Sequence, residues 1–169
     1  IKAMENYGWR LGTGFLSTPF ILDVLAGLNV EYAYKLLENE ECPGWLFMPK
    51  NGATTIWESW EGNMTSDRGI ASLNHYSKGA LCEWLIGSMC GIKMGDKLNT
   101  FVIKPVVGGT LKYAKASYNS IYGEVTSGWQ KKDGKTVYTV TIPSNTSATI
   151  ILPDGEQTVG AGTYKFVEG

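Results

Sequence analysis

The chain has 169 residues and a formal net charge of −1, which is enough length for one ordinary domain or two small ones. Hydrophobic residues make up 43% and charged residues 18% of the chain, and this composition excludes an intrinsically disordered protein. There is no basic surplus to neutralise phosphates and no apolar run near twenty residues, so we expect no nucleic acid partner and no membrane partner.

The first predicted elements are helices. Pro19 occupies the first position of a predicted helix that ends near Asn29, because the apolar residues between them follow helical spacing. The same spacing predicts a second helix over residues 30–38 and a third over residues 76–90. Residues 45–74 show little periodicity, and an irregular stretch of that length in a compact domain is typically functional.

The later elements are strands. Val, Ile and Thr account for 13 of the first 96 residues and for 23 of the remaining 73, which indicates a change from helical to strand-rich structure. The two stretches carry net charges of −4 and +3, so we predict two parts, residues 1–96 and residues 97–169. Turn signals separate the candidate strands, at residues 101–107, 110–117, 120–129, 136–142, 148–152 and 162–167. Antiparallel strands of this kind fit a β-sandwich.

A candidate site lies in residues 52–62, where Glu58 and Glu61 stand among the indoles of Trp57 and Trp60. Flat indoles suit the apolar face of a sugar, and glycoside hydrolysis generally needs two carboxyl groups across the scissile bond. On the pattern alone, the plainer interpretation is a surface carboxylate beside buried tryptophan side chains.

The only histidine, His75, comes just before the third predicted helix. The free N–H groups of a helix start make this a place where a histidine can also meet a sugar hydroxyl, although a histidine that simply satisfies the helix start is the plainer interpretation. Glu83, inside the same helix, is expected to make a structural pair. The cysteines are three in number and irregularly spaced, so we expect them to be reduced and mostly buried, without a disulfide framework or a zinc site.

Four stretches carry a resemblance to a known family. Residues 11–19, 52–62, 72–76 and 79–84 read LGTGFLSTP, GATTIWESWEG, SLNHY and GALCEW. In order, spacing and context they closely resemble the bacterial α-L-rhamnosidases of glycoside hydrolase family 78, and the resemblance spans essentially the whole chain. It implies an α+β chain with two parts, in which the last helices of an (α/α)6 barrel are followed by an antiparallel β-sandwich.

The resemblance also implies a reaction, the inverting hydrolysis of terminal α-L-rhamnose. Carried over by motif, Glu58 is the general base that activates water, and His75 contacts the sugar. Trp57 and Trp60 are expected to help bind the substrate, a rhamnose-containing glycoside or polysaccharide. No cofactor and no metal are expected. Family members occur in several compartments, so no localisation follows.

The chain departs from the family pattern because the motif that carries the general acid is not found in it. An (α/α)6 barrel has six helix pairs, and the first part supplies far fewer helices. We therefore expect the chain to be a C-terminal fragment that is inactive by itself and that needs the remainder of the catalytic barrel as a partner. The faces around Leu25, Leu37 and Leu85 are expected to be exposed in isolation, so that the fragment self-associates.

A second function class stays open, namely a carbohydrate-binding or purely structural β-sandwich module without catalysis. Its sugar platform would consist of aromatic residues of the second part: Tyr113, Tyr118, Tyr122 and Trp129. For these side chains, core or interface packing is the favoured interpretation.

Overall fold

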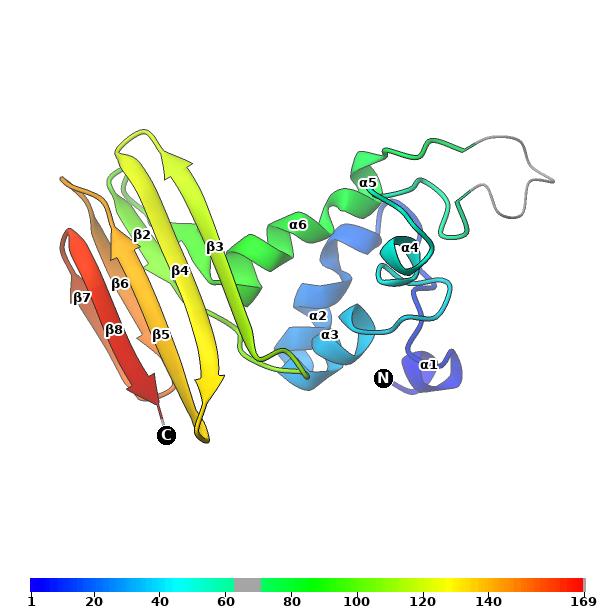
Figure 1. Ribbon diagram of the computed structural model, residues 1–169, viewed down its shortest axis with the longest axis horizontal. Helices are drawn as coiled ribbons and strands as arrows, with labels where there is room; N and C mark the ends of the chain where they lie inside the picture. Colours follow the sequence, from blue (N-terminus) through cyan, green and yellow to red (C-terminus); the bar gives the residue numbers. More distant parts are fainter. Residues whose placement is uncertain (63–70, 169) are drawn as a thin grey trace. The chain divides into compact units, whose positions relative to one another are not determined.

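The computed structural model describes residues 1–62 and 71–168 (Figure 1). The chain divides into two compact units, one formed by Ile1–Cys82 with Gly108–Thr110 and the other by Glu83–Val107 with Leu111–Gly169. The first unit is helical and the second consists mainly of strands, which confirms the predicted α+β class. A domain boundary at residue 97 stays a prediction.

Short helices build the first unit. They are α1 (Lys2–Asn6), the 3-10 turn η1 (Thr18–Phe20), α2 (Ile21–Leu28), α3 (Val30–Leu37), α4 (Phe47–Lys50) and α5 (Tyr76–Gly79), and α6 (Leu81–Trp84) spans the division between the units. The predicted helix from Pro19 starts as the 3-10 turn and continues as α2, and α3 matches its prediction to within one residue. Both α1 and α4 are too short to show a periodicity in the sequence, so neither was predicted.

Helices α2 and α3 form a hairpin around Asn29. The side chain of Asn29 accepts a hydrogen bond from the backbone N–H of Glu31 at 2.9 Å, so this residue caps the start of α3 as well as ending α2. The hairpin buries Leu22 of α2 and Leu36 of α3 almost completely.

The prediction of which apolar side chains are exposed is wrong. Leu25 and Leu37 are only 3% and 8% exposed because they face the interior of the hairpin unit, and Leu85 is half-buried. The exposed apolar residues of this region are instead Phe20, Val24 and Leu28, which are 66%, 58% and 65% exposed. Their spacing of four residues places them on one stripe of the helix.

A glycine pair packs against the aromatic ring of Tyr34 on α3. A Cβ atom on Gly108 would lie 2.6 Å from Cδ2 of Tyr34, so only glycine fits this close approach. The backbone N–H of Gly109 donates to both carboxylate oxygens of Glu31 at 3.3 Å, and that of Thr110 donates to Glu38 at 2.9 Å. The pair therefore has a packing role beyond the turn predicted from the sequence.

Two four-stranded sheets form the second unit. The strands are β1 (Ile92–Met94), β2 (Thr100–Ile103), β3 (Tyr113–Ser120), β4 (Gly123–Lys132), β5 (Lys135–Ile142), β6 (Ser147–Leu152), β7 (Gly155–Val159) and β8 (Gly162–Glu168). The sheet orders are β1-β2-β6-β7 and β3-β4-β5-β8. Every pair is antiparallel except β2 with β6, so the expectation of a wholly antiparallel sandwich is wrong for this one pair. The chain enters the other sheet for β3–β5 before it returns, and it comes back beside β2 in the same direction.

The core of the sandwich lies between the sheets and comes from alternate residues of the strands. It contains Ile92, Phe101, Ile103, Val125, Val140, Ile142, Ala148 and Ile150. At the β4–β5 turn, Asp133 and Gly134 both have positive φ, at 52° and 75°, as a type I′ hairpin requires. Strand β7 was not predicted because its side chains are almost all exposed and show no alternation.

The third predicted helix is interrupted. After α6 it continues as the π-helical segment η2 (Leu85–Met89) and stops at Gly91, whose φ is 76°. The carbonyl of Met89 accepts a hydrogen bond from the Trp129 indole at 2.9 Å, and that of Cys90 accepts one from the Ser127 hydroxyl at 2.6 Å. Side chains of β4 thus satisfy carbonyls that a helix end leaves without partners.

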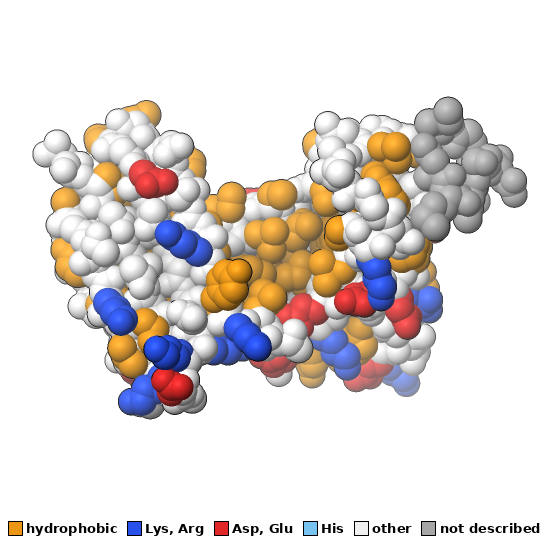
Figure 2. Space-filling view, viewed as in Figure 1, with side chains coloured by type: hydrophobic (Ala, Val, Ile, Leu, Met, Phe, Trp, Pro, Cys, Tyr) orange, Lys and Arg blue, Asp and Glu red, His pale blue; other side chains and the backbone are white. Residues whose placement is uncertain are grey.

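The surface charge of the second unit agrees with the net charge of +3 counted for residues 97–169. On the face shown in Figure 2, the charged side chains that lie over the strands are mostly those of Lys and Arg.

Among residues 1–62 and 71–168, the structure contains no helix with the length and apolar character needed to cross a membrane.

The glycine pair on Tyr34 generates a stability prediction. Gly109→Ala is expected to lower the free energy of unfolding by about 2–4 kcal/mol. The new Cβ would lie 2.7 Å from the Tyr34 ring, and the positive φ of this residue is unfavourable for alanine. Gly52→Ala is the matched control, since Gly52 also has positive φ but nothing within 4 Å of its Cβ position, and a loss of about 1 kcal/mol is expected there. Urea denaturation measures both, and equal losses would contradict the packing role.

The helix end generates a second prediction. Ser127→Ala is expected to lower the free energy of unfolding by about 1–3 kcal/mol, because it leaves the buried Cys90 carbonyl without its hydroxyl donor. Thr141→Val is the control, since the Thr141 hydroxyl pairs with that of Thr163 at an exposed position. Chemical denaturation of both variants checks this, and a Ser127→Ala variant as stable as the control would count against it.

Candidate active site

Two stretches that the sequence separates are joined by backbone hydrogen bonds. The N–H of Glu58 donates to the carbonyl of Ser72 at 2.8 Å, and the N–H of His75 donates to the carbonyl of Ile56 at 2.9 Å. In return, the N–H of Ser72 donates to Oε2 of the Glu58 carboxylate at 2.8 Å. The two motifs that contain Glu58 and His75 therefore lie side by side, with one carboxylate oxygen of Glu58 anchored. Residues 63–70 of the intervening stretch lie outside the described residues.

His75 is half-buried between two aromatic rings. Its ring is stacked on Phe15 at 4.9 Å and on Tyr76 at 5.2 Å between centroids. The Nδ1 atom accepts a hydrogen bond from the N–H of Ser77 at 3.3 Å, which fits the predicted role of this histidine at a helix start. With Nδ1 acting as acceptor, a neutral ring carries its proton on Nε2, and this N–H is the donor that it can offer a ligand.

The two tryptophans of the motif are buried beneath it. Trp57 is 8% exposed and packs against Gly62, where a Cβ would lie 2.6 Å from the ring. Trp60 is 9% exposed and meets Trp45 edge-on at 5.9 Å. In this unit the indoles support the loop that carries Glu58, and their direct contact with a sugar stays a prediction.

Sequence reasoning missed one residue here, Lys78 on α5. Its side chain is buried, and its ammonium lies 4.0 Å from the centroid of the Trp60 ring. Burial lowers the pKa of Lys78 to about 8, although the carboxylates of Glu61 and Glu58 favour the charged form. Its position three residues after His75 places it near the candidate site in the sequence, but the periodicity of a sequence does not show which lysines are buried.

The cysteines are free, as expected. Cys90 is buried, and burial raises the pKa of its thiol to about 11, so it is unreactive at neutral pH. Cys82 is exposed because it lies on the outward side of α6, so the expected burial is wrong for this residue. Within residues 1–62 and 71–168, no group of His, Cys, Asp and Glu side chains could hold a metal ion.

The aromatic residues considered for a sugar platform on the sandwich differ in exposure. Trp129 is 2% exposed, and its indole N–H donates a hydrogen bond to the Met89 carbonyl, so Trp129 cannot be part of a sugar platform. Tyr113 and Tyr118 are exposed, at 70% and 45%.

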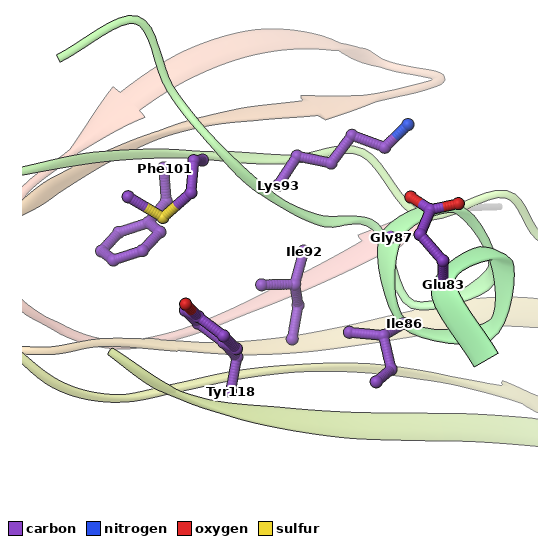
Figure 3. A pocket seen from close by; sticks show the side chains of 8 residues that line it. Glu83, Ile86, Gly87, Ile92, Lys93, Phe101 and Tyr118 are labelled. Atoms are coloured by element: carbon purple, nitrogen blue, oxygen red, sulfur yellow. The ribbon is translucent and has the colours of Figure 1, made fainter. Parts of the chain in front are cut away.

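An apolar pocket of about 330 Å³ lies within the second unit. Ile92 and Phe101 of the sandwich core form part of its lining, together with Ile86 and Met94. In Figure 3, the Glu83 carboxylate and the Lys93 side chain lie beside the helical segment that contains Glu83, Ile86 and Gly87. The Tyr118 ring lies at another side of the pocket. The other labelled residues come from β1, β2 and β3. Among the residues that the structure describes, Glu83 is the one carboxylate that lines this pocket, so the pocket suits an apolar group better than a hydrolytic reaction that needs two carboxyl groups.

The predicted site thus brings together a carboxylate with one anchored oxygen, an imidazole and a buried ammonium. A carboxylate so held can accept a proton from water, and an imidazole N–H can hold a hydroxyl group. Glycoside hydrolysis needs a second carboxyl group as acid, and no such partner for Glu58 is assigned within the part of the chain that the structure describes.

Comparison with known families identifies both parts of the chain. The model described as the bacterial α-L-rhamnosidase six-hairpin glycosidase domain matches residues 1–89. The model described as the bacterial α-L-rhamnosidase C-terminal domain matches residues 97–166.

Curated relatives extend the match over the whole length. An α-L-rhamnosidase of Formosa agariphila is 36% identical over 178 aligned residues, which cover 100% of this chain and 19% of that protein. An α-L-rhamnosidase of Streptomyces avermitilis is 35% identical over 160 residues, covering 90% of this chain and 15% of that protein. The chain therefore spans less than a fifth of the length of these relatives.

Solved structures agree. The chain resembles the crystal structure of the Streptomyces avermitilis α-L-rhamnosidase complexed with L-rhamnose, with a TM-score of 0.88 and 31% identity over 99% of this chain and 19% of that one. It also resembles the native α-L-rhamnosidase of Aspergillus terreus, with a TM-score of 0.90 and 27% identity over 99% of this chain and 20% of that one. These matches show that the chain belongs to the bacterial α-L-rhamnosidase family and corresponds to the C-terminal part of such a protein.

Proposed function

We propose that the whole protein is an inverting α-L-rhamnosidase that removes terminal α-L-rhamnose from glycosides or polysaccharides, and that Glu58 is its general base. The observation that carries this proposal is the paired arrangement of residues 56–58 and 72–75, which anchors the Glu58 carboxylate beside the segment of His75. The L-rhamnose in the related Streptomyces avermitilis structure supports the substrate class.

In this mechanism the Ser72 N–H holds Oε2 of Glu58, which leaves the other carboxylate oxygen to take a proton from the attacking water. The Nε2–H of His75 donates to a hydroxyl of the sugar. An inverting enzyme holds its two carboxyl groups roughly 6.5–9.5 Å apart to make room for that water. In this proposal the general acid comes from a part of the barrel that this chain does not contain, so the fragment alone is inactive.

The exposed stripe of α2 supports the remainder of the catalytic barrel as a partner. Phe20, Val24 and Leu28 form an apolar face on a helix that belongs to the matched six-hairpin domain. A contiguous apolar face of this kind is typical of a surface that another part of the protein covers.

Replacement of the base tests the proposal. In the whole protein, Glu58→Gln is expected to lower kcat on an aryl α-L-rhamnoside by about 100-fold or more, because the amide cannot accept the proton from water. Glu40→Gln is the matched control, since Glu40 is an exposed glutamate that pairs with Lys50. Circular dichroism checks that both variants fold.

Full activity of the Glu58→Gln enzyme would contradict the assignment of the base. The stereochemistry is tested separately by proton NMR of the first product formed. Release of β-L-rhamnose supports inversion, whereas release of α-L-rhamnose would show that the mechanism is retaining.

A further prediction concerns the 169-residue chain alone. We expect it to show no hydrolysis of the aryl rhamnoside and to self-associate through the α2 stripe, since water contact with these side chains is unfavourable. Analytical ultracentrifugation should find species larger than 18.5 kDa, and the double variant Phe20→Gln/Leu28→Gln should reduce them. Tyr113→Gln, which removes an exposed ring from the other unit, should not. A wild-type chain that sediments only as a monomer would refute this prediction.

A further inference from the structure

The sheet β3-β4-β5-β8 has an inner face and an outer face. Successive side chains of a strand point to opposite faces, and Val125 of β4 and Val140 of β5 belong to the core between the sheets. The residues that alternate with them, such as Gly128 and Thr139, therefore lie on the outer face. These two residues stand opposite each other in the register of β4 and β5.

A hollow lies over the outer face. It is a cavity of about 510 Å³ lined by residues of β3, β4 and β5, and its volume is within the range of ligand sites. Gly128 contributes no side chain to it, and a Cβ there would lie 3.0 Å from the Ala114 carbonyl oxygen. The lining residues of the outer face that carry a hydroxyl or amide group are Tyr113, Thr126, Gln130, Thr139 and Thr141. The hollow can thus form hydrogen bonds with a ligand that is rich in hydroxyl groups.

Tyr113 adds an aromatic ring to this hollow. It is 70% exposed, and it lies on the edge strand β3 opposite Gln130. Tyr118 pairs with Val125 and therefore belongs to the other face of the sheet. A flat ring beside hydroxyl and amide groups suits a sugar, because the ring covers the apolar face of the sugar while the polar groups meet its hydroxyls.

The outer face is also positively charged. In the described strands, four exposed lysines and one glutamate lie on it, namely Lys115, Lys132, Lys135, Lys165 and Glu124. Lys115 and Lys165 stand at the two ends of one row across the sheet, with Gly128 and Thr139 between them. A surface with one sign of charge attracts ligands of the opposite sign.

The length of this row favours a chain over a single sugar. Three strand spacings of about 4.8 Å separate β3 from β8, so the backbones of Lys115 and Lys165 lie roughly 14 Å apart. One sugar ring is too short to reach both lysines, whereas several linked sugars can cross the hollow between them.

We propose that the outer face of the sheet β3-β4-β5-β8 binds an anionic sugar chain, with one ring of the chain on Tyr113 and its carboxylate or sulfate groups on Lys115 and Lys165. The inference deepens the proposed function and rests on it, because it gives the polysaccharide substrate a point of attachment on the second unit. Attachment there would hold a long substrate to the enzyme between successive cleavages.

Isothermal titration calorimetry of the whole protein tests the site with sugar chains that contain no rhamnose, so that the proposed catalytic site does not contribute. Polygalacturonate carries carboxylates, dextran sulfate carries sulfates, and dextran is the neutral chain. At least one anionic chain is expected to bind about tenfold more tightly than dextran, with an affinity that falls as salt is added. The anionic chain that binds identifies the charged group. No binding, or equal affinity for all three chains, would overturn the proposal.

Variants of the whole protein then locate the binding. Lys115→Gln/Lys165→Gln is expected to lower the affinity for the anionic chain about tenfold, and Tyr113→Ala about five- to tenfold. Lys97→Gln/Lys104→Gln is the matched control, since it removes two exposed lysines of the same unit that lie outside this sheet. An equal loss in the control, or poly-L-glutamate binding as tightly as the sugar chain, would reduce the effect to unspecific charge and refute the site.

Thermal melting of each variant completes the test. These side chains are exposed, so the melting temperatures are expected to stay within a few degrees of the wild type. A wild type that binds no chain, together with variants that melt much earlier, would show that another part of the protein covers this face, and the proposal fails. The result is separate from that of the base: an active Glu58→Gln enzyme refutes the proposed function, whereas binding that survives the Lys115/Lys165 and Tyr113 variants refutes only this site.

Discussion

Backbone N–H and carbonyl groups lose their regular partners where helices and strands end, and the need to supply other partners is the constraint on which this structure depends. It acts at three places. At the end of the interrupted helix, Trp129 and Ser127 donate to the carbonyls of Met89 and Cys90. At the glycine pair, carboxylates of α3 accept from the backbone N–H groups of residues 109 and 110. In the candidate site, residues 56–58 and 72–75 satisfy one another.

The third place shows how an irregular loop can hold a carboxylate in one position. A carboxylate on a free loop would sample many rotamers, and each would need to be ordered before reaction. Here the N–H of Ser72 fixes one oxygen of Glu58 while buried Trp57 and Trp60 hold the loop from below. The tryptophans that the sequence offers as sugar contacts are therefore packing residues of this loop, and the Lys78 ammonium lies on the face of Trp60.

Membership of the α-L-rhamnosidase family gives a context for two features of the chain. The chain spans less than a fifth of its curated relatives, and its helical unit leaves an apolar stripe of α2 exposed. A proposed base without a proposed acid fits the same picture, because the two carboxyl groups of a glycosidase need not lie close together in the sequence. The β-sandwich has its own core between two sheets.

The sequence by itself determined the α+β class, the positions of α2, α3 and most strands, and the family, because these depend on local periodicity and on motifs of adjacent residues. The roles of Glu58 and His75 stay predictions from those motifs, although the structure brings the two segments together. Only the tertiary structure decided that β2 and β6 run parallel, that Leu25 and Leu37 are buried, and that Lys78 lies on Trp60. Each of these depends on contacts between residues far apart in the chain, and the periodicity of a single segment contains no record of what that segment packs against.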